Sequence, residues 1–291
     1  LISLWQKAYG AQCTGLLLDS LSKHPPIYIR LNNTKGDEEY LLRRMMEENV
    51  KVNTITWIPH AAVLEASGSV SSLDSFQEGL FHVQDLSSQL CATLLETKPG
   101  ERVLDVCAAP GGKTFTIAEQ MENSGEVFAF DQYKGKVRLI REGAKRLGLT
   151  CIHAELSDAL RPEKPYECAD RVLCDAQCSG LGILRRKPEI RYKSPSALDS
   201  LPDLQYLILC ISANLTKKHG VLLYSTCTLN PGENNQVARR FLLEHPDFEP
   251  YPVSLPEGYE RNSFDRENEA TLFVKKNGTD GFFFSGFRRL R

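Results

Sequence analysis

Short apolar segments alternate with helical patterns from about residue 81 onward, and this alternation restricts the possible folds more than any other feature. The strand-like segments lie at residues 102–107, 126–131, 171–175 and 220–225. Runs of this length that are rich in Val, Leu and Phe and bounded by turn residues are typical of strands in a parallel sheet. The sequence therefore predicts an α/β fold with a doubly wound sheet.

One helix of this fold is predicted at residues 134–147. Its apolar side chains recur at helical spacing, and Gly148 follows as the stop signal. These side chains belong to Val137, Ile140, Ala144 and Leu147. Near the end of the chain, residues 271–274 and 281–285 are predicted to form an antiparallel pair.

The first part of the chain has a different pattern, with short helical and strand-like runs. It is predicted to form a small α+β domain, residues 1–80, ahead of a larger domain, residues 81–291. Residues 27–31 alternate like a strand, and residues 38–48 have the pattern of a helix. A Ser-rich stretch at residues 67–72 marks the predicted junction. Because the sequence lacks an initiator Met and begins in a helical pattern, we expect further residues upstream.

The charge balance and the cysteines limit the class of protein. Basic residues number 35 and acidic residues 37, so the net charge of −2 excludes a histone-like polycation. No run approaches the roughly 18 apolar residues of a membrane span, and the start has no signal-peptide pattern. The nine cysteines contain no C-x-x-C pair, which favours free thiols in a reducing compartment over a disulfide scaffold or a zinc site. These features predict a cytoplasmic protein without a metal or membrane contact. We also expect a monomer.

The first predicted strand runs into a loop of small residues and then into a helix at about residues 114–121. The loop comprises Cys107, Ala108, Ala109, Pro110, Gly111, Gly112 and Lys113. Small side chains let a ligand approach the backbone, and a helix start offers free N–H groups. The end of the loop is similar to a phosphate-binding P-loop, but that pattern requires Gly where Cys107 stands. The dinucleotide-binding pattern is absent as well.

Two carboxylates follow the next two strands in chain order. Asp131 ends the second strand, at the distance along the chain where a carboxylate accepts two ribose hydroxyls. Asp158 follows a third strand, where it can bond the adenine amino group of the same ligand. The plainer interpretations are a solvated Asp after a tight turn and a helix cap. Together with the small-residue loop, Asp131 points to a nucleoside cofactor such as S-adenosylmethionine.

Two cysteines follow the segments at residues 171–175 and 220–225, which are the fourth and fifth strands when the strand before Asp158 counts as the third. Asp175 and Cys178 follow the fourth strand, and Cys227 follows the fifth. Single cysteines in apolar strands usually contribute to packing, as we expect of Cys174 and Cys210. A thiolate that adds to C6 of a pyrimidine makes C5 nucleophilic towards a methyl sulfonium, and a hydrogen bond at N3 stabilises the adduct. Two thiols and a carboxyl group at one sheet edge therefore fit methyl transfer to C5.

Four motifs give the chain a resemblance to the RNA 5-methylcytosine methyltransferases, and among them to bacterial enzymes of 16S ribosomal RNA. The motifs lie at residues 107–114, 175–180, 185–190 and 225–227, and residues 81–88 and 280–283 fit as well. The resemblance covers nearly the whole chain and implies a Rossmann-like S-adenosylmethionine-dependent methyltransferase with a mixed seven-stranded sheet. Members of this subtype also carry an N-terminal helical RNA-binding domain, which we expect this chain to lack.

The resemblance also implies roles for single residues. Cys227 would attack C6, Cys178 would assist release of the covalent adduct, and Asp175 would hold the base through N3. The small-residue loop and the two carboxylates after it would hold S-adenosylmethionine, with Asp175 at the border of that site. Gln177 stands where the family has Pro, which rigidifies the turn that presents the cysteine. We expect looser positioning of the base from this change rather than loss of function.

A basic run, residues 185–193, directly follows the Cys178 motif. The expected RNA contacts are Arg185, Arg186, Lys187 and Arg191. Such a run is ordinarily a solvated face, but its place beside the expected active site favours contacts with RNA phosphates. Tyr192 could stack on a neighbouring base. Because the target base has to leave its stack to reach the thiols, we expect single-stranded or loop RNA as the substrate.

The sequence as a whole predicts transfer of a methyl group from S-adenosylmethionine to cytosine C5 in ribosomal RNA. Two alternatives stay open: the same chemistry on transfer RNA, and a non-catalytic RNA-binding assembly factor, which the Gln177 departure suggests. A Cys hydrolase is disfavoured because no His lies near either cysteine motif in the sequence. RNA is the expected partner under each of the remaining hypotheses.

Overall fold

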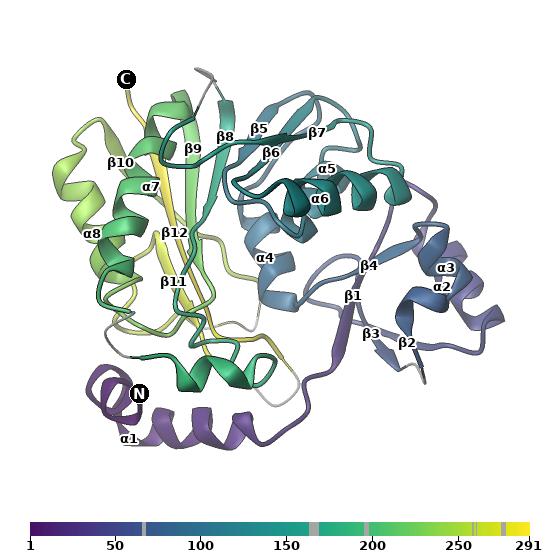
Figure 1. The fold of residues 1–291 in the computed structure, drawn as a ribbon, viewed down its shortest axis with the longest axis horizontal. Helices are drawn as coiled ribbons and strands as arrows, with labels where there is room; N and C mark the ends of the chain where they lie inside the picture. Colours follow the sequence, from purple (N-terminus) through teal and green to yellow (C-terminus); the bar gives the residue numbers. More distant parts are fainter. Residues whose placement is uncertain (66–67, 163–168, 195–197, 258, 260, 275–277) are drawn as a thin grey trace. The chain divides into compact units, whose positions relative to one another are not determined.

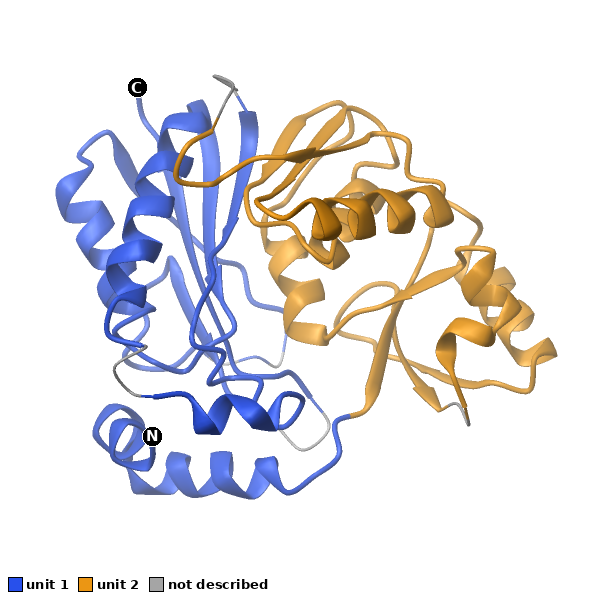
Figure 2. Cartoon of the chain, in the orientation of Figure 1, with its two compact units in different colours: residues 1–25, 165–291 blue, residues 26–164 orange. Residues whose placement is uncertain are grey.

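The computed structural model describes residues 1–65, 68–162, 169–194, 198–257, 259, 261–274 and 278–291. The chain forms two compact units, one of residues 1–25 and 165–291 and one of residues 26–164 (Figure 2). The predicted junction at residues 67–72 therefore falls inside one unit. Its first residue, Ser67, lies outside the described residues.

The unit of residues 26–164 contains a small antiparallel sheet in the order β2-β3-β1-β4 (Figure 1). Its elements are β1 (Ile27–Leu31), α2 (Glu38–Glu47), β2 (Lys51–Thr54), β3 (Ala61–Glu65), the short 3-10 helix η1 (Val70–Ser72), α3 (Asp74–Gln77) and β4 (Phe81–Val83). Helix α2 begins after Asp37, whose carboxylate accepts a hydrogen bond from the Tyr40 backbone N–H at 2.8 Å. The strand predicted at residues 27–31 and the helix predicted at residues 38–48 are both confirmed.

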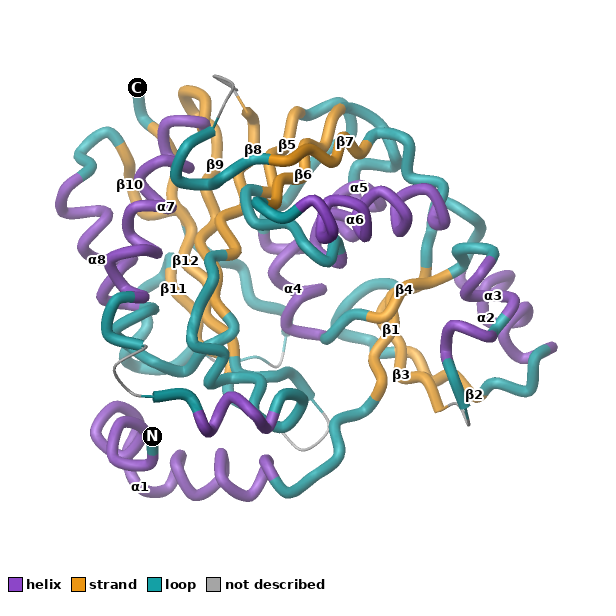
Figure 3. Tube along the Cα trace, viewed as in Figure 1, coloured by secondary structure: helices purple, strands orange, loops and turns teal. Residues whose placement is uncertain are grey.

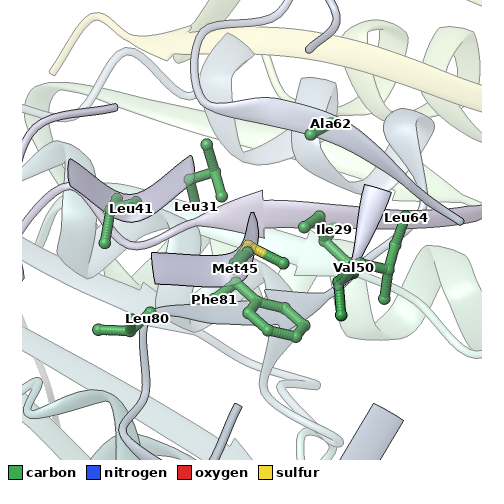
Figure 4. Packing of buried hydrophobic residues seen from close by; sticks show 9 residues of the cluster. All are labelled: Ile29, Leu31, Leu41, Met45, Val50, Ala62, Leu64, Leu80 and Phe81. Carbon is green, nitrogen blue, oxygen red and sulfur yellow. The ribbon is translucent and has the colours of Figure 1, made fainter. Parts of the chain in front are cut away.

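A cluster of buried apolar side chains forms the core of this small sheet (Figure 4). The cluster comprises Ile29, Leu31, Leu41, Met45, Val50, Ala62, Leu64, Leu80 and Phe81. Leu41 and Met45 are four residues apart on α2 and therefore share the face that packs on the strands. Burial of each large side chain contributes roughly 1.5–3 kcal/mol to the stability of the fold.

The same unit contains three parallel strands, with β5 beside β6 and β6 beside β7. Its further elements are α4 (Leu86–Leu94), β5 (Arg102–Asp105), α5 (Gly112–Gln120), β6 (Glu126–Asp131), α6 (Lys134–Leu147) and β7 (Ile152–Leu156). Both β6 and α6 have the predicted bounds, and Gly148 ends α6 with a φ of 75°, which glycine adopts without strain. Strand β5 is shorter than predicted because residues 106–107 already turn into the following loop.

The unit of residues 1–25 and 165–291 carries the remaining strands. Its elements are α1 (Ile2–Leu21), β8 (Ala169–Asp175), the 3-10 helix η2 (Pro188–Tyr192), α7 (Leu201–Leu215), β9 (Thr216–Thr226), α8 (Asn235–Glu244), β10 (Phe248–Tyr251), β11 (Glu269–Leu272) and β12 (Phe282–Arg289). Helix α7 packs on β8 and β9, and α8 packs on α7 and β10 (Figure 3). The antiparallel pair predicted near the end of the chain is confirmed, with Leu272 opposite Phe282.

The large sheet has the strand order β10-β12-β9-β8-β5-β6-β7, and β11 pairs with β12 as an additional strand. Strand β8 is parallel to β9, whereas β12 is antiparallel to β9, β10 and β11, so the sheet is mixed. The predicted fold class is confirmed: a Rossmann-like α/β fold with a mixed sheet of at least seven strands, preceded by a small α+β part.

Two features of the structure concern the predicted division after residue 80. Strand β4 begins at Phe81 and pairs with β1, so the small sheet extends past residue 80. Helix α1 belongs to the other unit, where Trp5 is buried and donates its indole N–H to the Leu229 carbonyl at 3.2 Å. The partner of Trp5 is 224 positions away in the sequence, which explains why local patterns did not assign this helix.

Eight of the nine cysteines lie in the described part of the chain, and all eight are free thiols. Among the same residues, no group of three or more His, Cys, Asp or Glu side chains is arranged to hold a metal ion. None of the helices formed by the described residues combines the length and the apolar character needed to cross a bilayer.

Candidate active site

The small-residue loop predicted to hold the cofactor connects β5 to the start of α5. Gly111 has a φ of 113° in this loop, and a Cβ at this position would lie 2.4 Å from the Phe115 ring. Glycine is therefore required here, because the Phe115 ring occupies the space that a side chain would need. Cys107 and Lys113 are half-buried at the two ends of the loop, Pro110 is exposed and Gly111 is buried.

Two buried hydrogen bonds hold the first turn of α5. Thr114 Oγ1 donates to Asp105 Oδ2 at 2.7 Å, and Thr116 Oγ1 donates to Gln84 Oε1 at 2.7 Å. The helix start, where the first N–H groups of a helix lack partners within the helix and carry partial positive charge, is thereby fixed at the carboxyl end of β5. This arrangement fits a ligand that carries a carboxylate, as the amino-acid part of S-adenosylmethionine does.

The two carboxylates predicted to bind the cofactor lie at the same edge of these parallel strands. Asp131 ends β6 and is 8% exposed; its Oδ1 accepts the Tyr133 backbone N–H at 3.0 Å, and Lys136 Nζ lies 3.6 Å from its Oδ2. Asp158 follows β7 and is exposed, and its Oδ1 accepts the Leu160 backbone N–H at 2.9 Å. The structure thus brings the loop and both carboxylates to one edge, although Asp158 also caps its own turn.

The two cysteines predicted to be catalytic are in contact. Cys178 Sγ and Cys227 Sγ are 3.3 Å apart, and both residues are half-buried. Parallel pairing of β8 and β9 explains this proximity, because Asp175 lies opposite Ser225 and each cysteine follows two or three residues later. The structure therefore brings both thiols to one point of the sheet edge.

Asp175 is held at the same edge by the neighbouring strand. Its Oδ1 accepts a hydrogen bond from Ser225 Oγ at 2.7 Å. Next to the thiols, the Gly182 N–H donates to the Cys227 carbonyl at 3.0 Å, and a Cβ at Gly182 would lie 2.0 Å from the Gly281 oxygen. Two glycines are therefore needed where the chain passes the Cys227 turn.

The environment of Cys178 favours its protonated form. The pKa of the Cys178 thiol is raised well above its ordinary value, first by its hydrogen bond with Cys227 and then by burial. The negative charge of Glu233 raises this pKa further. Cys178 therefore keeps its proton and can donate it to the sulfur of Cys227. A sulfur that accepts such a hydrogen bond is better stabilised as a thiolate, the form in which cysteine attacks.

Sequence reasoning missed the polar residues that surround the thiol turns. Glu233 is fully buried and accepts hydrogen bonds from Ser179 N–H at 2.8 Å and from Gln205 Nε2 at 2.9 Å. Gln205 Nε2 also donates to the Gln177 carbonyl at 3.0 Å, while the Gln177 side chain is exposed. The Gln177 turn is thus held by a hydrogen bond from α7 to its backbone. The one trace of Glu233 in the sequence is an Asn-Pro-Gly-Glu turn, and such turns are usually solvated.

Arg185 does not have the exposed position that the sequence predicts. Its side chain is 1% exposed, and it donates to Asp280 Oδ1 at 2.5 Å and to the Gly278 carbonyl at 2.9 Å. Arg186 binds the other oxygen of Asp280, with 27% of its side chain exposed. A buried guanidinium that neutralises a buried carboxylate is not available to a phosphate. The prediction of an RNA contact is therefore corrected for Arg185.

The rest of the basic run presents its side chains to solvent. The exposed residues are Lys187, Pro188, Glu189, Arg191, Tyr192 and Lys193, so one acidic side chain lies among the basic ones. The segment is anchored by buried Ile190, since a Cβ at Gly180 would lie 2.8 Å from Ile190 Cδ1. Lys193 Nζ donates to the Ser179 carbonyl at 3.4 Å, and Tyr192 is 83% exposed. Cationic and aromatic side chains therefore stand on a segment that packs directly on the Cys178 turn.

This fold, with its loop, strand-end carboxylates and paired thiols, defines a class: Rossmann-like methyltransferases that use S-adenosylmethionine. A family model described as 16S rRNA methyltransferase RsmB/F matches residues 92–288. A second model, described as the ferredoxin-like domain of RsmF/B-like methyltransferases, matches residues 1–71. The chain belongs to the RsmB/F family of 16S rRNA methyltransferases.

Relatives in two bacteria match nearly the whole chain. A Bacillus subtilis protein named probable ribosomal RNA small subunit methyltransferase B is 41% identical over 99% of this chain and 65% of its own length. A Synechocystis protein of the same name is 35% identical over 99% of this chain and 66% of its own length. The chain thus spans slightly less than two thirds of the length of these relatives.

Solved structures share the fold. A methyltransferase homologue from Pyrococcus horikoshii superposes with a TM-score of 0.84 at 27% identity, covering 99% of this chain and 94% of that one. The structure of Pyrococcus horikoshii NSun6 with SFG, an analogue of S-adenosylmethionine, has a TM-score of 0.86 at 21% identity. That match covers 100% of this chain and 98% of the other, and at this identity it speaks for the fold alone.

Proposed function

We propose that the chain transfers the methyl group of S-adenosylmethionine to C5 of a cytosine in small-subunit ribosomal RNA, through a covalent bond between Cys227 and C6. The observation that carries this proposal is the contact of the Cys178 and Cys227 sulfurs at 3.3 Å, beside the carboxyl group of Asp175. A single nucleophile needs no second thiol in contact with it. Formation and release of a covalent adduct give each thiol a separate task.

In this proposal the two thiols act in sequence. Cys227 attacks C6 as a thiolate, which the S–H of Cys178 stabilises by a hydrogen bond. The new S–C6 bond makes C5 electron-rich, so C5 can accept a methyl group. Solvent water then takes the proton from C5, the electrons of the C–H bond restore the C5–C6 double bond, and the S–C6 bond breaks so that Cys227 leaves as a thiolate. The S–H of Cys178, whose sulfur lies 3.3 Å from that of Cys227, assists this release by a hydrogen bond to the departing sulfur.

Asp175 is assigned to the base. Electron density collects at N3 when a thiolate adds to C6, and a hydrogen-bond donor at N3 stabilises the adduct. A carboxyl group donates there only when it carries a proton, and Ser225 Oγ orients the Asp175 carboxyl from the strand side. Asp175 therefore favours the adduct over the free base rather than binding both equally.

The cofactor is assigned to the loop between β5 and α5. When bound, S-adenosylmethionine supplies an electrophilic methyl group. The start of α5, where the first N–H groups of a helix have no partner within the helix, fits its amino-acid part, and Asp131 fits its ribose hydroxyls. Asp158 is assigned to the adenine amino group, for which the half of its carboxylate not bound to Leu160 is the acceptor.

The RNA is assigned to η2 and its neighbours. Lys187 and Arg191 are exposed beside the Cys178 turn and can neutralise phosphates, and Tyr192 offers a ring for stacking. The target base has to be flipped or unpaired, because a stacked base does not reach half-buried thiols. The free thiols fit the reducing cytoplasm in which ribosomal RNA is modified.

The test is methyl transfer by the purified protein from isotope-labelled S-adenosylmethionine to unmodified RNA, followed by bisulfite sequencing of the product. We expect label in small-subunit ribosomal RNA, at a cytosine that resists bisulfite conversion. Label in transfer RNA instead would show that transfer RNA, not ribosomal RNA, is the substrate. Binding of ribosomal RNA without any transfer would favour a non-catalytic assembly factor.

A further inference from the structure

The carboxylate of Glu233 is buried next to the two thiol turns, and its residue has no exposed surface. It accepts four hydrogen bonds: from Ser179 N–H at 2.8 Å, Ser179 Oγ at 2.6 Å, Gln205 Nε2 at 2.9 Å and Asn230 Nδ2 at 3.0 Å. Within the described ranges, no Lys, Arg or His forms an ion pair with it. A buried carboxylate without a cation is tolerated only because hydrogen bonds satisfy it fully.

The donors to Glu233 belong to the turns that carry the cysteines. Ser179 directly follows Cys178, and its Oγ lies 2.6 Å from Oγ1 of Thr228, which directly follows Cys227. The carboxylate, the serine and the threonine therefore form one chain of hydrogen bonds from turn to turn. Short hydrogen bonds to a charged acceptor in a dry interior are among the stronger ones in proteins.

A second set of hydrogen bonds fixes the carboxylate itself. Gln205, on α7, bridges Glu233 and the Gln177 carbonyl, so it joins the Cys178 turn to the same acceptor. The backbone carbonyl of Glu233 accepts the hydroxyl of Tyr224 at 2.6 Å, which ties the loop after β9 back to that strand. Glu233 is thus held from both sides while it holds the thiol turns.

We propose that Glu233 is a positioning residue, which keeps the turns of Cys178 and Cys227 at the separation that adduct formation and release require. The effect on methyl transfer rests on the proposed function, whereas the effect on the separation of the sulfurs does not. Glu233 touches neither RNA nor cofactor in this account, so its loss lowers kcat and leaves both binding affinities unchanged. Misplacement of a reacting group by about 1 Å can cost on the order of 100-fold in rate.

The direct test measures the proximity of the sulfurs without RNA or cofactor. Diamide, an azodicarboxamide oxidant, takes one hydrogen from each thiol and becomes the hydrazine, while a Cys178–Cys227 disulfide forms. Mass spectrometry of digested protein follows this disulfide over time. We expect rapid cross-linking in the wild type and a rate lower by at least about 10-fold in Glu233→Ala, because proximity sets the rate of the second step.

Two further variants separate positioning from general stability. Glu269 is also fully buried and accepts hydrogen bonds from Asn235 at 2.9 Å and Arg239 at 2.7 Å, so Glu269→Ala removes a buried carboxylate elsewhere. We expect that control to cross-link like the wild type even if its thermal stability falls. Glu233→Gln keeps the side-chain volume and one acceptor oxygen, so we expect a rate between those of the wild type and Glu233→Ala. Single-turnover methyl transfer should follow the same order, with the RNA KM unchanged.

Each outcome decides one of the two proposals. Wild-type cross-linking rates in both Glu233→Ala and Glu233→Gln would overturn the positioning role. If Glu233→Ala shows no cooperative thermal transition, it is not folded, and only the Glu233→Gln variant is compared with the wild type. A wild-type cross-linking rate in Glu233→Gln would then overturn the positioning role as well. Slow cross-linking in the Glu233 variants, together with no methyl transfer by the wild type, would uphold positioning and refute the proposed function.

Discussion

Arg185 and Lys187 lie two positions apart in one basic run, yet they have different surroundings. Arg185 is buried against Asp280, whereas Lys187 is exposed. The arginine belongs to the core because without it the carboxylate of Asp280 would be a poorly compensated buried charge. A count of charges along the sequence cannot separate the two residues, since Asp280 lies 95 positions from Arg185.

This difference predicts unequal effects on stability. We expect Arg185→Ala to lower the free energy of unfolding by about 3 kcal/mol, because Asp280 then loses the buried guanidinium that binds its Oδ1. Lys187→Ala, as the control, should change it by less than about 0.5 kcal/mol. Urea unfolding followed by circular dichroism measures both values. Equal losses in the two variants would show that Arg185 has no special role in the core.

Asp131 is the residue on which the cofactor assignment depends most. We expect Asp131→Asn to weaken S-adenosylmethionine binding by about 10- to 100-fold, because a hydrogen bond to a charged group contributes about 1.5–3 kcal/mol. Calorimetric titration measures the affinity, and thermal unfolding checks that the variant is folded. Unchanged affinity in a folded variant would remove Asp131 from the site.

The elements best predicted from sequence are those with a regular apolar pattern. Strand β6 and helix α6 have the predicted bounds because their buried residues recur at the period of each structure. Strand β2 was not predicted, because none of its four residues is buried and pairing with β3 rather than its sequence makes it a strand. Helix α1 was seen as a helical start but not placed, because its partner Leu229 is distant in sequence.

The segment around η2 carries the prediction at the scale of an element. Replacing Lys187 and Arg191 together by Ala should weaken binding of single-stranded RNA. The slope of log affinity against log salt should fall by about 1.4, because each phosphate contact on a single strand contributes about 0.7. Filter binding at several salt concentrations gives the slope, and S-adenosylmethionine affinity should not change.

The matched control for this surface is Lys218→Ala, an exposed lysine near the start of β9, at the opposite end of that strand from Cys227. It should leave the slope within error of the wild type. If the double variant behaves like this control, the exposed face of η2 is solvated and contributes nothing to RNA binding.

At the scale of the whole molecule, topology made much of the candidate site predictable. The carboxyl ends of neighbouring parallel strands meet at one edge, so Cys178 and Cys227 could be expected together from their places after two strands. The supporting residues could not, because Glu233 acts on Ser179 across 54 positions and its turn has no distinctive pattern. The sequence therefore predicts the residues at a strand end better than the distant residues that hydrogen-bond to them.

The central claim is that Cys227 forms the covalent bond and Cys178 releases it. Because a missing nucleophile prevents the adduct and a missing release residue lets it persist, the two alanine variants should fail in different ways. Each variant removes one sulfur atom, and the two sulfurs are only 3.3 Å apart. The two variants therefore control for each other.

The decisive measurement is denaturing electrophoresis of each variant after incubation with labelled RNA and S-adenosylmethionine. Cys178→Ala should accumulate a protein–RNA complex that survives denaturation and requires S-adenosylmethionine, and Cys227→Ala should give neither that complex nor methylated product. A trapped complex in Cys227→Ala alone would exchange the two roles. No complex in either variant, together with methyl transfer by both, would contradict the covalent mechanism itself.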